Sequence, residues 1–400
     1  MIRARRPRFS LLAMLLWCGC GGGATFEADP QPATIAVFPA GPLTVRAGDA
    51  LALSLTVRDR NGQGLSTHVS FISSAPNVAT AAAVPCCSTS SYALTALAPG
   101  TAVITAFSGD AVTKLTVNVV TWPRTVVSGP AFGAAARGSV ALVTTLDGHV
   151  LRLDAASGAV VATYDYYSTY VAFSNDGARA FFANTVFDLA TGSEVHALVA
   201  DPSTTCGQIT AAREQPGGTL IFLGCSGGVL TVNGTTSAVI SSVAAGPVTS
   251  LALHPTDPRL YASVPTDGRV DEISTQSTGL IRELPILGGP QGAVLPGGSE
   301  IDVAMEGDHQ VERWDLAALE ATDSAHVQPL PGGGGPYDLV ESTDGTRLLA
   351  SVGGFVVELD RATLTVTKTY WVGGTARRIG VADGRAVVAN EGGWIDLLPF

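Results

Sequence analysis

Hydrophobic and polar residues alternate along most of this chain with a period of two. Residues 51–58 place Leu and Val between Ala, Ser, Thr and Arg, and residues 102–107 and 115–119 repeat the pattern. Successive side chains of a β-strand point to opposite faces, so the alternation predicts short, half-buried strands. Clusters of Gly, Asp, Asn and Pro separate the runs, which predicts tight turns between antiparallel strands. The pattern therefore predicts an all-β chain.

Residues 32–120 form a first block of about seven short strands in ~90 residues, the spacing of a two-sheet sandwich. Residues 69–80 and 94–106 resemble the central strand and the late signature of the group 2 bacterial Ig-like domain, with Phe71 in place of the family's usual Trp. The inserted pair Cys86-Cys87 departs from the family pattern. The resemblance implies an Ig-like β-sandwich that acts as an extracytoplasmic spacer or adhesion module and not as a catalyst.

Residues 124–400 form a second block, which repeats. Turn residues that follow candidate inner strands recur with a period of about 40 residues. They are Gly138, Gly177, Gly218, Asp257, Gly298, Gly345 and Gly384. Such a period, with several strands in each unit, predicts a β-propeller, and the markers predict seven blades.

Two further markers recur in this block. Gly-Pro pairs precede several inner strands, and acid-led turns begin at Asp154, Asp188, Asp315 and Asp360. Together these features resemble the YVTN-type propeller repeat over nearly all of residues 124–400. The last unit, from about residue 374, contains only three strand-sized runs. We expect residues 124–128 to supply its fourth strand, which would close the ring and remove an exposed edge.

The first nineteen residues have the pattern of an export signal. A basic segment, residues 1–8, precedes an apolar run, residues 9–17, that is too short to span a bilayer. The end of the signal resembles a bacterial lipobox, which implies cleavage before Cys20 and acylation of that cysteine. An ordinary cleaved signal is the alternative. We expect a signal peptide over residues 1–19, a tether over residues 20–31, and a location in the cell envelope, at the outer membrane or cell surface.

Composition excludes some partners and leaves others open. The net charge is −11, so a nucleic-acid binder that neutralises phosphates is not expected. Beyond the signal no apolar stretch is long enough to span a membrane. We expect a monomer that contacts the membrane only through its N-terminal lipid.

Four cysteines remain after the signal. Cys206 and Cys225 lie symmetrically about a predicted hairpin turn, which favours a disulfide across two strands; a free buried pair is the alternative. Cys86 and Cys87 are adjacent, and their redox state stays open. Neither pair has the spacing of a metal site, so we expect no metal and no cofactor.

No catalytic set emerges from the sequence. Residues 224–228 match the G-x-S-x-G pattern around Ser226, but that nucleophile needs a strand-to-helix turn. Here the motif joins two predicted antiparallel strands, so we expect a hairpin turn and not an enzyme. The six histidines are scattered.

Propellers usually bind ligands on the face that carries the loops between blades. The candidate residues on that face are Tyr167, Tyr170, His149, Asp267, Arg269, Asp308, His309, Arg377 and Arg378. Strand packing could instead account for the tyrosines, turn chemistry for the Asp-Gly pairs, and a solvated rim for the two arginines; a ring of cations around the channel is the sharper alternative.

These observations predict an envelope protein whose propeller binds a protein or glycan, with the Ig-like domain as a spacer. Two rival functions stay open. One is a propeller enzyme, lactonase-like or quinoprotein-dehydrogenase-like, which rests on fold analogy alone. The other is a purely structural envelope protein.

Overall fold

The computed structural model describes residues 31–84, 91–201, 206–294, 298–327 and 334–400. These residues form antiparallel and parallel strands with one short 3-10 turn, Pro265–Asp267, and no α-helix occurs among them. The all-β prediction is confirmed. No helix in this described part of the chain is long and apolar enough to cross a membrane. The predicted signal peptide, most of the tether, Cys20, Cys86 and Cys87 lie outside the described residues.

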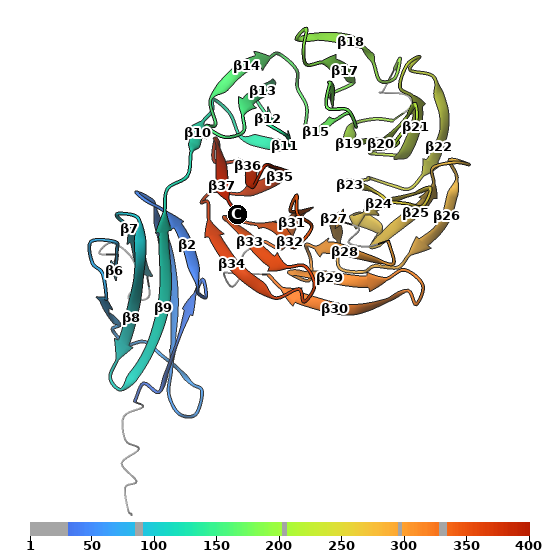
Figure 1. The fold of residues 1–400 in the computed structure, drawn as a ribbon. Coiled ribbons are helices and arrows are strands. Elements are labelled where there is room, and N and C mark those ends of the chain that lie inside the picture. Colours follow the sequence, from blue (N-terminus) through green and yellow to red (C-terminus); the bar gives the residue numbers. More distant parts are fainter. Residues whose placement is uncertain (1–30, 85–90, 202–205, 295–297, 328–333) are drawn as a thin grey trace, which may run out of the picture.

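The N-terminal unit consists of two sheets packed face to face (Figure 1). One sheet contains β1 (Thr34–Phe38), β3 (Ala50–Arg58), β4 (Gly64–Leu65), β6 (Ala79–Ala83) and β7 (Ser91–Ala96). The other contains β2 (Leu43–Arg46), β5 (Ser70–Ser73), β8 (Gly100–Ser108) and β9 (Ala111–Val120). The alternating residues of both sheets meet in one core, in which Leu51, Leu94 and Val117 are fully enclosed.

The C-terminal unit consists of seven four-stranded antiparallel groups. The first three contain β11–β14 (Ala131–Arg137, Val140–Thr145, His149–Asp154, Val160–Tyr164), β15–β18 (Val171–Phe173, Arg179–Phe182, Thr185–Asp188, Ser193–Ala197) and β19–β22 (Ile209–Glu214, Leu220–Cys225, Gly228–Asn233, Val239–Ala244). The next three contain β23–β26 (Ser250–Leu253, Arg259–Val264, Arg269–Ser274, Leu280–Leu284), β27–β30 (Pro290–Val294, Glu300–Met305, Gln310–Asp315, Glu320–His326) and β31–β34 (Pro336–Glu341, Arg347–Val352, Phe355–Asp360, Val366–Trp371). The seventh contains β35–β37 (Ala376–Ala382, Arg385–Asn390, Trp394–Pro399) and β10 (Arg124–Val126).

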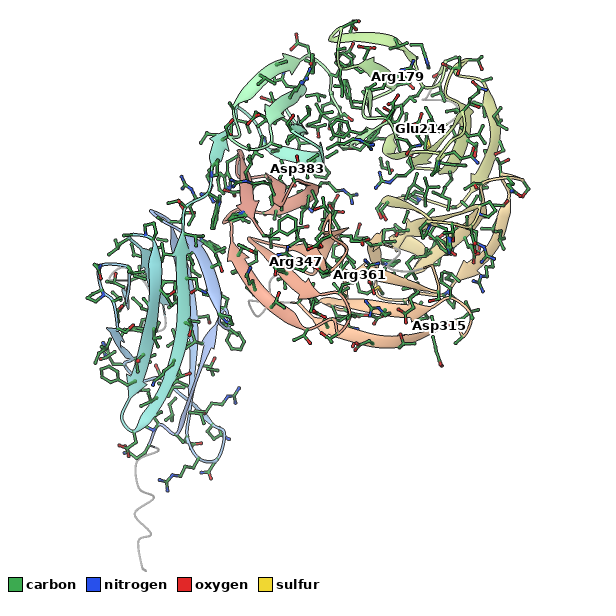
Figure 2. The ribbon with its side chains drawn as sticks, viewed as in Figure 1. Arg179, Glu214, Asp315, Arg347, Arg361 and Asp383 are labelled. Carbon is green, nitrogen blue, oxygen red and sulfur yellow. A yellow bond between two sulfur atoms is a disulfide. The ribbon has the colours of Figure 1, made fainter. Side chains whose placement is uncertain are left out.

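The groups are arranged around a central opening (Figure 1). Each first strand contacts the first strand of the next group, and β35 contacts β11. Apolar side chains fill the spaces between consecutive groups, including the last and the first (Figure 2). Burial between the groups, and not within any one of them, therefore stabilises the unit.

The expected completion of the last group by the start of the unit is confirmed. β10 pairs antiparallel with β37, with Arg124 opposite Asp396 and Val126 opposite Trp394. This pairing brings together segments that are about 270 residues apart, and it covers the edge that β37 would otherwise expose.

The two units share one continuous sheet. β2 pairs parallel with β9 on one side and with β34 on the other, with Leu43 opposite Thr369 and Val45 opposite Trp371. The Trp371 indole N–H also donates to the backbone oxygen of Ala50 at 3.3 Å. The result is an eight-stranded sheet that runs from one unit into the other, so the N-terminal unit is joined by backbone hydrogen bonds and not only by the linker at residues 121–123.

A buried charge network lies beside this shared sheet. Arg124 contacts the carboxylate of Asp396 at 2.7 Å and that of Asp49, in the N-terminal unit, at 3.1 Å. The Trp122 indole N–H donates to the same Asp396 carboxylate at 2.8 Å. Asp396 has no exposed side-chain surface, and burial raises its pKa against the opposing effect of Arg124. The network links both units and the closing strand.

The acid-led turns use their carboxylates as turn acceptors, and a related turn follows β31. There Asp344 accepts hydrogen bonds from the Ser342 hydroxyl at 2.6 Å and from the Thr346 backbone N–H at 3.1 Å. These bonds, the Ser342 bond first, lower the pKa of Asp344 from 3.8 to about 2.

Because the folded-state pKa of Asp344 is lowered, its ionised form stabilises the fold above its ordinary pKa. That contribution is lost as the pH falls from 3.8 towards about 2. We therefore expect Asp344→Asn to lower the dependence of the melting temperature on pH in this window. Thermal melts at pH 4.5, 3.5 and 2.5 measure it. Asp110→Asn, at an exposed turn, is the control, and identical pH profiles for both variants would contradict the expectation.

Candidate functional site

The starts of the seven inner strands lie on one face, hereafter the loop face. It comprises residues 129–132, 167–170, 207–209, 247–249, 289–291, 335–337 and 374–377, with the turns at 146–148, 265–268 and 306–309. Because each group is an antiparallel meander, the loop into its first strand and the turn between its second and third strands share a side. The predicted binding residues therefore lie on or next to one face.

A channel opens at the centre of the loop face. Its narrow part is a cavity of about 100 Å³ lined by residues from all seven inner strands. One residue in or directly before each inner strand lines it in turn: Gly133, Tyr170, Thr210, Thr249, Gly292, Asp338 and Arg378. The side chains at this level are small except for Tyr170, Asp338 and Arg378.

Arg378 crosses the channel. It forms an ion pair with Asp338 at 2.9 Å and donates to the backbone oxygen of Thr249, in the fourth group, at 2.6 Å. The second oxygen of Asp338 accepts the Ile379 N–H at 2.8 Å. These contacts hold the Arg378 side chain across the channel, so Arg378 is not a solvated charge at the rim.

Arg377 lies at the channel mouth in an aromatic cluster. Its guanidinium is 4.5 Å from the centre of the Tyr337 ring and 5.5 Å from that of Phe132. The two rings contact each other edge to face at 6.0 Å, and Glu391 accepts a hydrogen bond from Arg377 at 2.7 Å. Phe132 and Tyr337 were not among the residues predicted from the sequence. Each lies one or two residues after a Gly-Pro marker, and an aromatic residue so close to that marker could have identified them.

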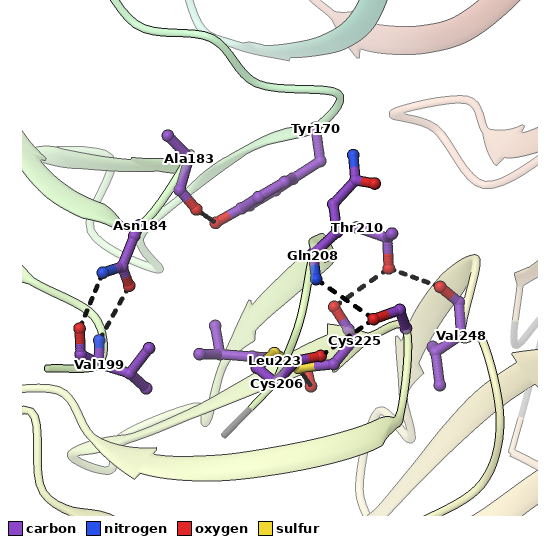
Figure 3. Close-up of a disulfide and its surroundings, with 12 residues drawn as sticks. Tyr170, Ala183, Asn184, Val199, Cys206, Gln208, Thr210, Leu223, Cys225 and Val248 are labelled. Atoms are coloured by element: carbon purple, nitrogen blue, oxygen red, sulfur yellow. Dashed lines mark hydrogen bonds between the residues drawn. A yellow bond between two sulfur atoms is a disulfide. The ribbon is translucent and has the colours of Figure 1, made fainter. Parts of the chain in front are cut away.

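The predicted tyrosine cluster divides. Tyr164 and Tyr166 pack on Phe187 and Phe182, and Tyr170 is only 4% exposed. The Tyr170 hydroxyl donates to the backbone oxygen of Ala183 at 2.7 Å (Figure 3), and burial raises its pKa. Packing against the second group therefore accounts for these three tyrosines.

Tyr167 differs, because 59% of it is exposed. It lines a surface pocket of about 330 Å³ together with Ser168, Thr169, Ala183, Asn184, Gly207, Gln208 and Ile209. The side-chain amide of Gln208 donates to the Thr169 hydroxyl at 3.2 Å. The pocket thus combines an exposed aromatic ring with amide, hydroxyl and backbone polar groups.

A disulfide supports one wall of this pocket. Cys206 and Cys225 are bonded, with their Cα atoms 5.2 Å apart (Figure 3), which confirms the predicted pair. The register differs from expectation: Ile209, and not Cys206, lies opposite Cys225. The pairs from Glu214–Ile221 to Ala211–Gly224 centre the hairpin between Gly217 and Gly218, later than the midpoint of the two cysteines, and a bulge at Thr210 shifts the register by one more residue. Cys206 belongs to the loop, and the bond fixes that loop to β20.

Ser226 lies in the two-residue turn between β20 and β21, as the sequence predicted. Its hydroxyl donates to the Cys206 backbone oxygen at 3.2 Å and accepts the Gln208 N–H at 3.2 Å. Both bonds hold the loop beside the disulfide, so this serine has a structural role: it supports the loop that lines the pocket.

The other candidate residues contact nearby side chains or form part of a turn. His149 is 3.1 Å from Asp165. Arg269 pairs with Asp267 at 2.7 Å and with Asp271 at 2.8 Å. Asp308 and His309 form a hairpin turn, in which His309 has a φ of 58°. The structure does not bring these residues together with Tyr167 or Arg377.

Among the described residues, no three His, Cys, Asp or Glu side chains are grouped so that they could hold a metal ion. No protein-family model matches the chain, and no curated protein matches it significantly.

Proposed function

We propose that this protein is an exported, lipid-anchored envelope protein that binds glycans on the loop face. In this proposal residues 32–120 are an Ig-like sandwich, and residues 124–400 are a seven-bladed propeller of the YVTN type. The sandwich acts as a rigid spacer, and the protein is a monomer. The seven similar four-stranded groups around a channel and the lipobox-like start of the chain support this assignment.

The exposed ring of Tyr167 beside its polar pocket carries the glycan proposal. A sugar presents an apolar face that packs on an aromatic ring and hydroxyl groups that need amide, hydroxyl or backbone partners. Tyr offers a large apolar surface with a polar end, and binding sites combine such surfaces with a few fixed polar groups. The disulfide and the Ser226 bonds hold Gly207 and Gln208 in place, which lowers the entropy cost of binding.

A protein partner is the second candidate, and a different observation favours it. Arg377, Tyr337 and Phe132 form a preassembled cluster at the channel mouth. Aromatic residues and Arg dominate the energetics of protein interfaces. A protein ligand would therefore depend on the channel mouth, whereas a glycan would depend on the Tyr167 pocket.

Binding to a panel of defined neutral, amino and acidic oligosaccharides tests the proposal. We expect Tyr167→Ala to weaken binding of the recognised sugar by about tenfold, the loss of one aromatic contact. Val161→Ala is the matched control, since Val161 is similarly exposed but lies on the outer strand β14. The proposal fails if no oligosaccharide binds, or if Tyr167→Ala binds as well as the control.

A further inference from the structure

The far half of the channel is positively charged. Beyond Arg378, a second cavity of about 260 Å³ is lined by residues of β11, β15, β19 and β35. Its lining includes Arg137 and Arg213 and contains no acidic residue. Arg213 also lines the narrow cavity of about 100 Å³, so its side chain lies where the two cavities join.

Arg213 has no carboxylate partner in the described structure. Its one hydrogen bond runs from Nη1 to the Ala212 backbone oxygen at 2.9 Å. The next residue, Glu214, accepts the Asn175 backbone N–H at 2.5 Å instead, on the other side of the strand. Arg137 contacts only the backbone oxygens of Ser174 and Asn175.

Among the described residues that line the two cavities, Asp338 is the one carboxylate, and both of its oxygens already have partners. Asp338 uses one oxygen for Arg378 and the other for the Ile379 N–H. The channel thus holds the guanidinium groups of Arg137, Arg213 and Arg378 against one carboxylate. The Arg213 side chain is exposed to solvent, although the surrounding protein lowers its pKa, with Asp338 opposing and Arg378 adding to the shift. Arg stays ionised in proteins, so this charge is available to an anion that enters the channel.

The residues that line the cavities around Arg213 leave room for a small ligand that accepts strong hydrogen bonds. The lining of the far cavity is otherwise Ala, Val, Ile, Gly and Phe, so no bulky side chain fills it. The inner strands are the terminal strands of their sheets, so they present unpaired backbone N–H groups towards the channel. The narrow cavity has room for a few water molecules or one small ion.

We propose that the channel binds a small oxyanion of the phosphate or sulfate type at Arg213. The planar guanidinium matches such an anion with two parallel hydrogen bonds. Arg378 blocks the path from the loop face, so the anion enters from the opposite end, past Arg137. This route admits a free anion and excludes a sugar or peptide that carries the same group.

Calorimetric titration of the full chain with phosphate or sulfate, at constant ionic strength in Tris chloride, tests the site. We expect one anion per chain, and at least tenfold weaker binding in Arg213→Gln. Arg179→Gln is the matched control, because it removes the same charge from an exposed arginine that lines neither cavity. Arg213→Lys, which keeps the charge without the planar fork, should bind with intermediate affinity.

Thermal melts provide a second readout that does not depend on the heat of binding. Without oxyanion, Arg213→Gln should melt close to the wild-type temperature, because Arg213 is exposed and forms no ion pair among the described residues. With 50 mM phosphate, the wild type and Arg179→Gln should gain stability while Arg213→Gln does not. The proposal is wrong if phosphate and sulfate stabilise no more than chloride, if Arg213→Gln binds like the wild type, or if only phosphorylated sugars bind.

Discussion

Deletion of residues 394–400 is expected to unfold the whole C-terminal unit and not merely to shorten it. The segment contains β37, which lies between β36 and β10 in the last group. Its Ile395, Leu397 and Leu398 have no exposed surface. Each such side chain contributes about 1.5–3 kcal/mol when buried, against a total stability of roughly 5–15 kcal/mol for a domain.

Because of the position of β37, the loss of stability should exceed the sum expected from its buried side chains alone. Its side chains belong to two cores, one shared with the sixth group and one shared with the first. The deletion also leaves β10 without a partner and removes Asp396 from Arg124. Without the last group, the first and sixth groups would face each other across a gap that neither can fill.

Circular dichroism melts and hydrogen exchange of the truncated chain measure this effect. We expect no cooperative transition and no slowly exchanging amides in residues 124–390. Deletion of Phe400 alone is the control, because that residue is only partly buried against one core and packs on Arg347, so its loss should cost far less than that of β37. If the variant that lacks residues 394–400 melted cooperatively within a few degrees of the wild type, the groups would not depend on one another for stability, and the prediction would be wrong.

Arg124→Met is expected to destabilise the protein by about 3–5 kcal/mol, the usual result when one partner of a buried pair is removed. Asp396 would keep the Trp122 indole N–H as a hydrogen-bond donor but would lose its cationic partner. Asp49 and the Val372 backbone oxygen would lose the same guanidinium.

The destabilisation by Arg124→Met should depend on pH. Burial already raises the pKa of Asp396, and the loss of Arg124 removes the main opposing effect. A raised folded-state pKa makes stability greatest below the ordinary pKa of Asp, and stability is then lost as the pH rises through the folded-state value. Urea unfolding at pH 5 and pH 7.5 should therefore show a larger deficit at pH 7.5.

The double variant Arg124→Met with Asp396→Asn separates the charge effect from a loss of packing. The neutral amide removes the unpaired carboxylate, so we expect the double variant to be more stable than Arg124→Met alone at pH 7.5. A double variant that is as unstable as the single one at both pH values would show that the Arg124 side chain acts through packing and not through its charge.

Local patterns in the sequence were sufficient to predict strands, turns and the repeat. The alternation at 51–58 predicts a strand with one buried face, and β3 has that burial pattern. The shortage of strands in the last unit predicts the pairing of β10 with β37, because an unpaired edge must be covered. Both inferences depend on requirements that each segment must satisfy by itself.

The shared sheet could not be predicted in this way. β2 has only four residues, and its partner β34 lies more than 320 positions further along the chain. A parallel pairing over that separation has no connecting turn to set the register. The sequence also could not show that Arg377 and Arg378 have different environments. Both lie in a bulge of β35, which directs Arg377 to the channel mouth and Arg378 across the channel.

The tyrosine cluster shows the same limit at shorter range. Residues 165–170 lie between β14 and β15 and not in a strand, so alternation does not decide which rings are covered. Contacts with the neighbouring group decide it: Ala183 and Phe182 cover Tyr170 and Tyr166, whereas Tyr167 lies over the open pocket.

The continuity of β2 with β34 has a consequence for how the loop face meets its ligand. A flexible leash would let the C-terminal unit sample many orientations, and its effective concentration near a surface would depend on leash length. Here the backbone hydrogen bonds between β2 and β34 fix the two units to each other. In a protein held at its N-terminus, the orientation of this two-unit body, and not the length of a linker between the units, would decide which way the Tyr167 pocket points.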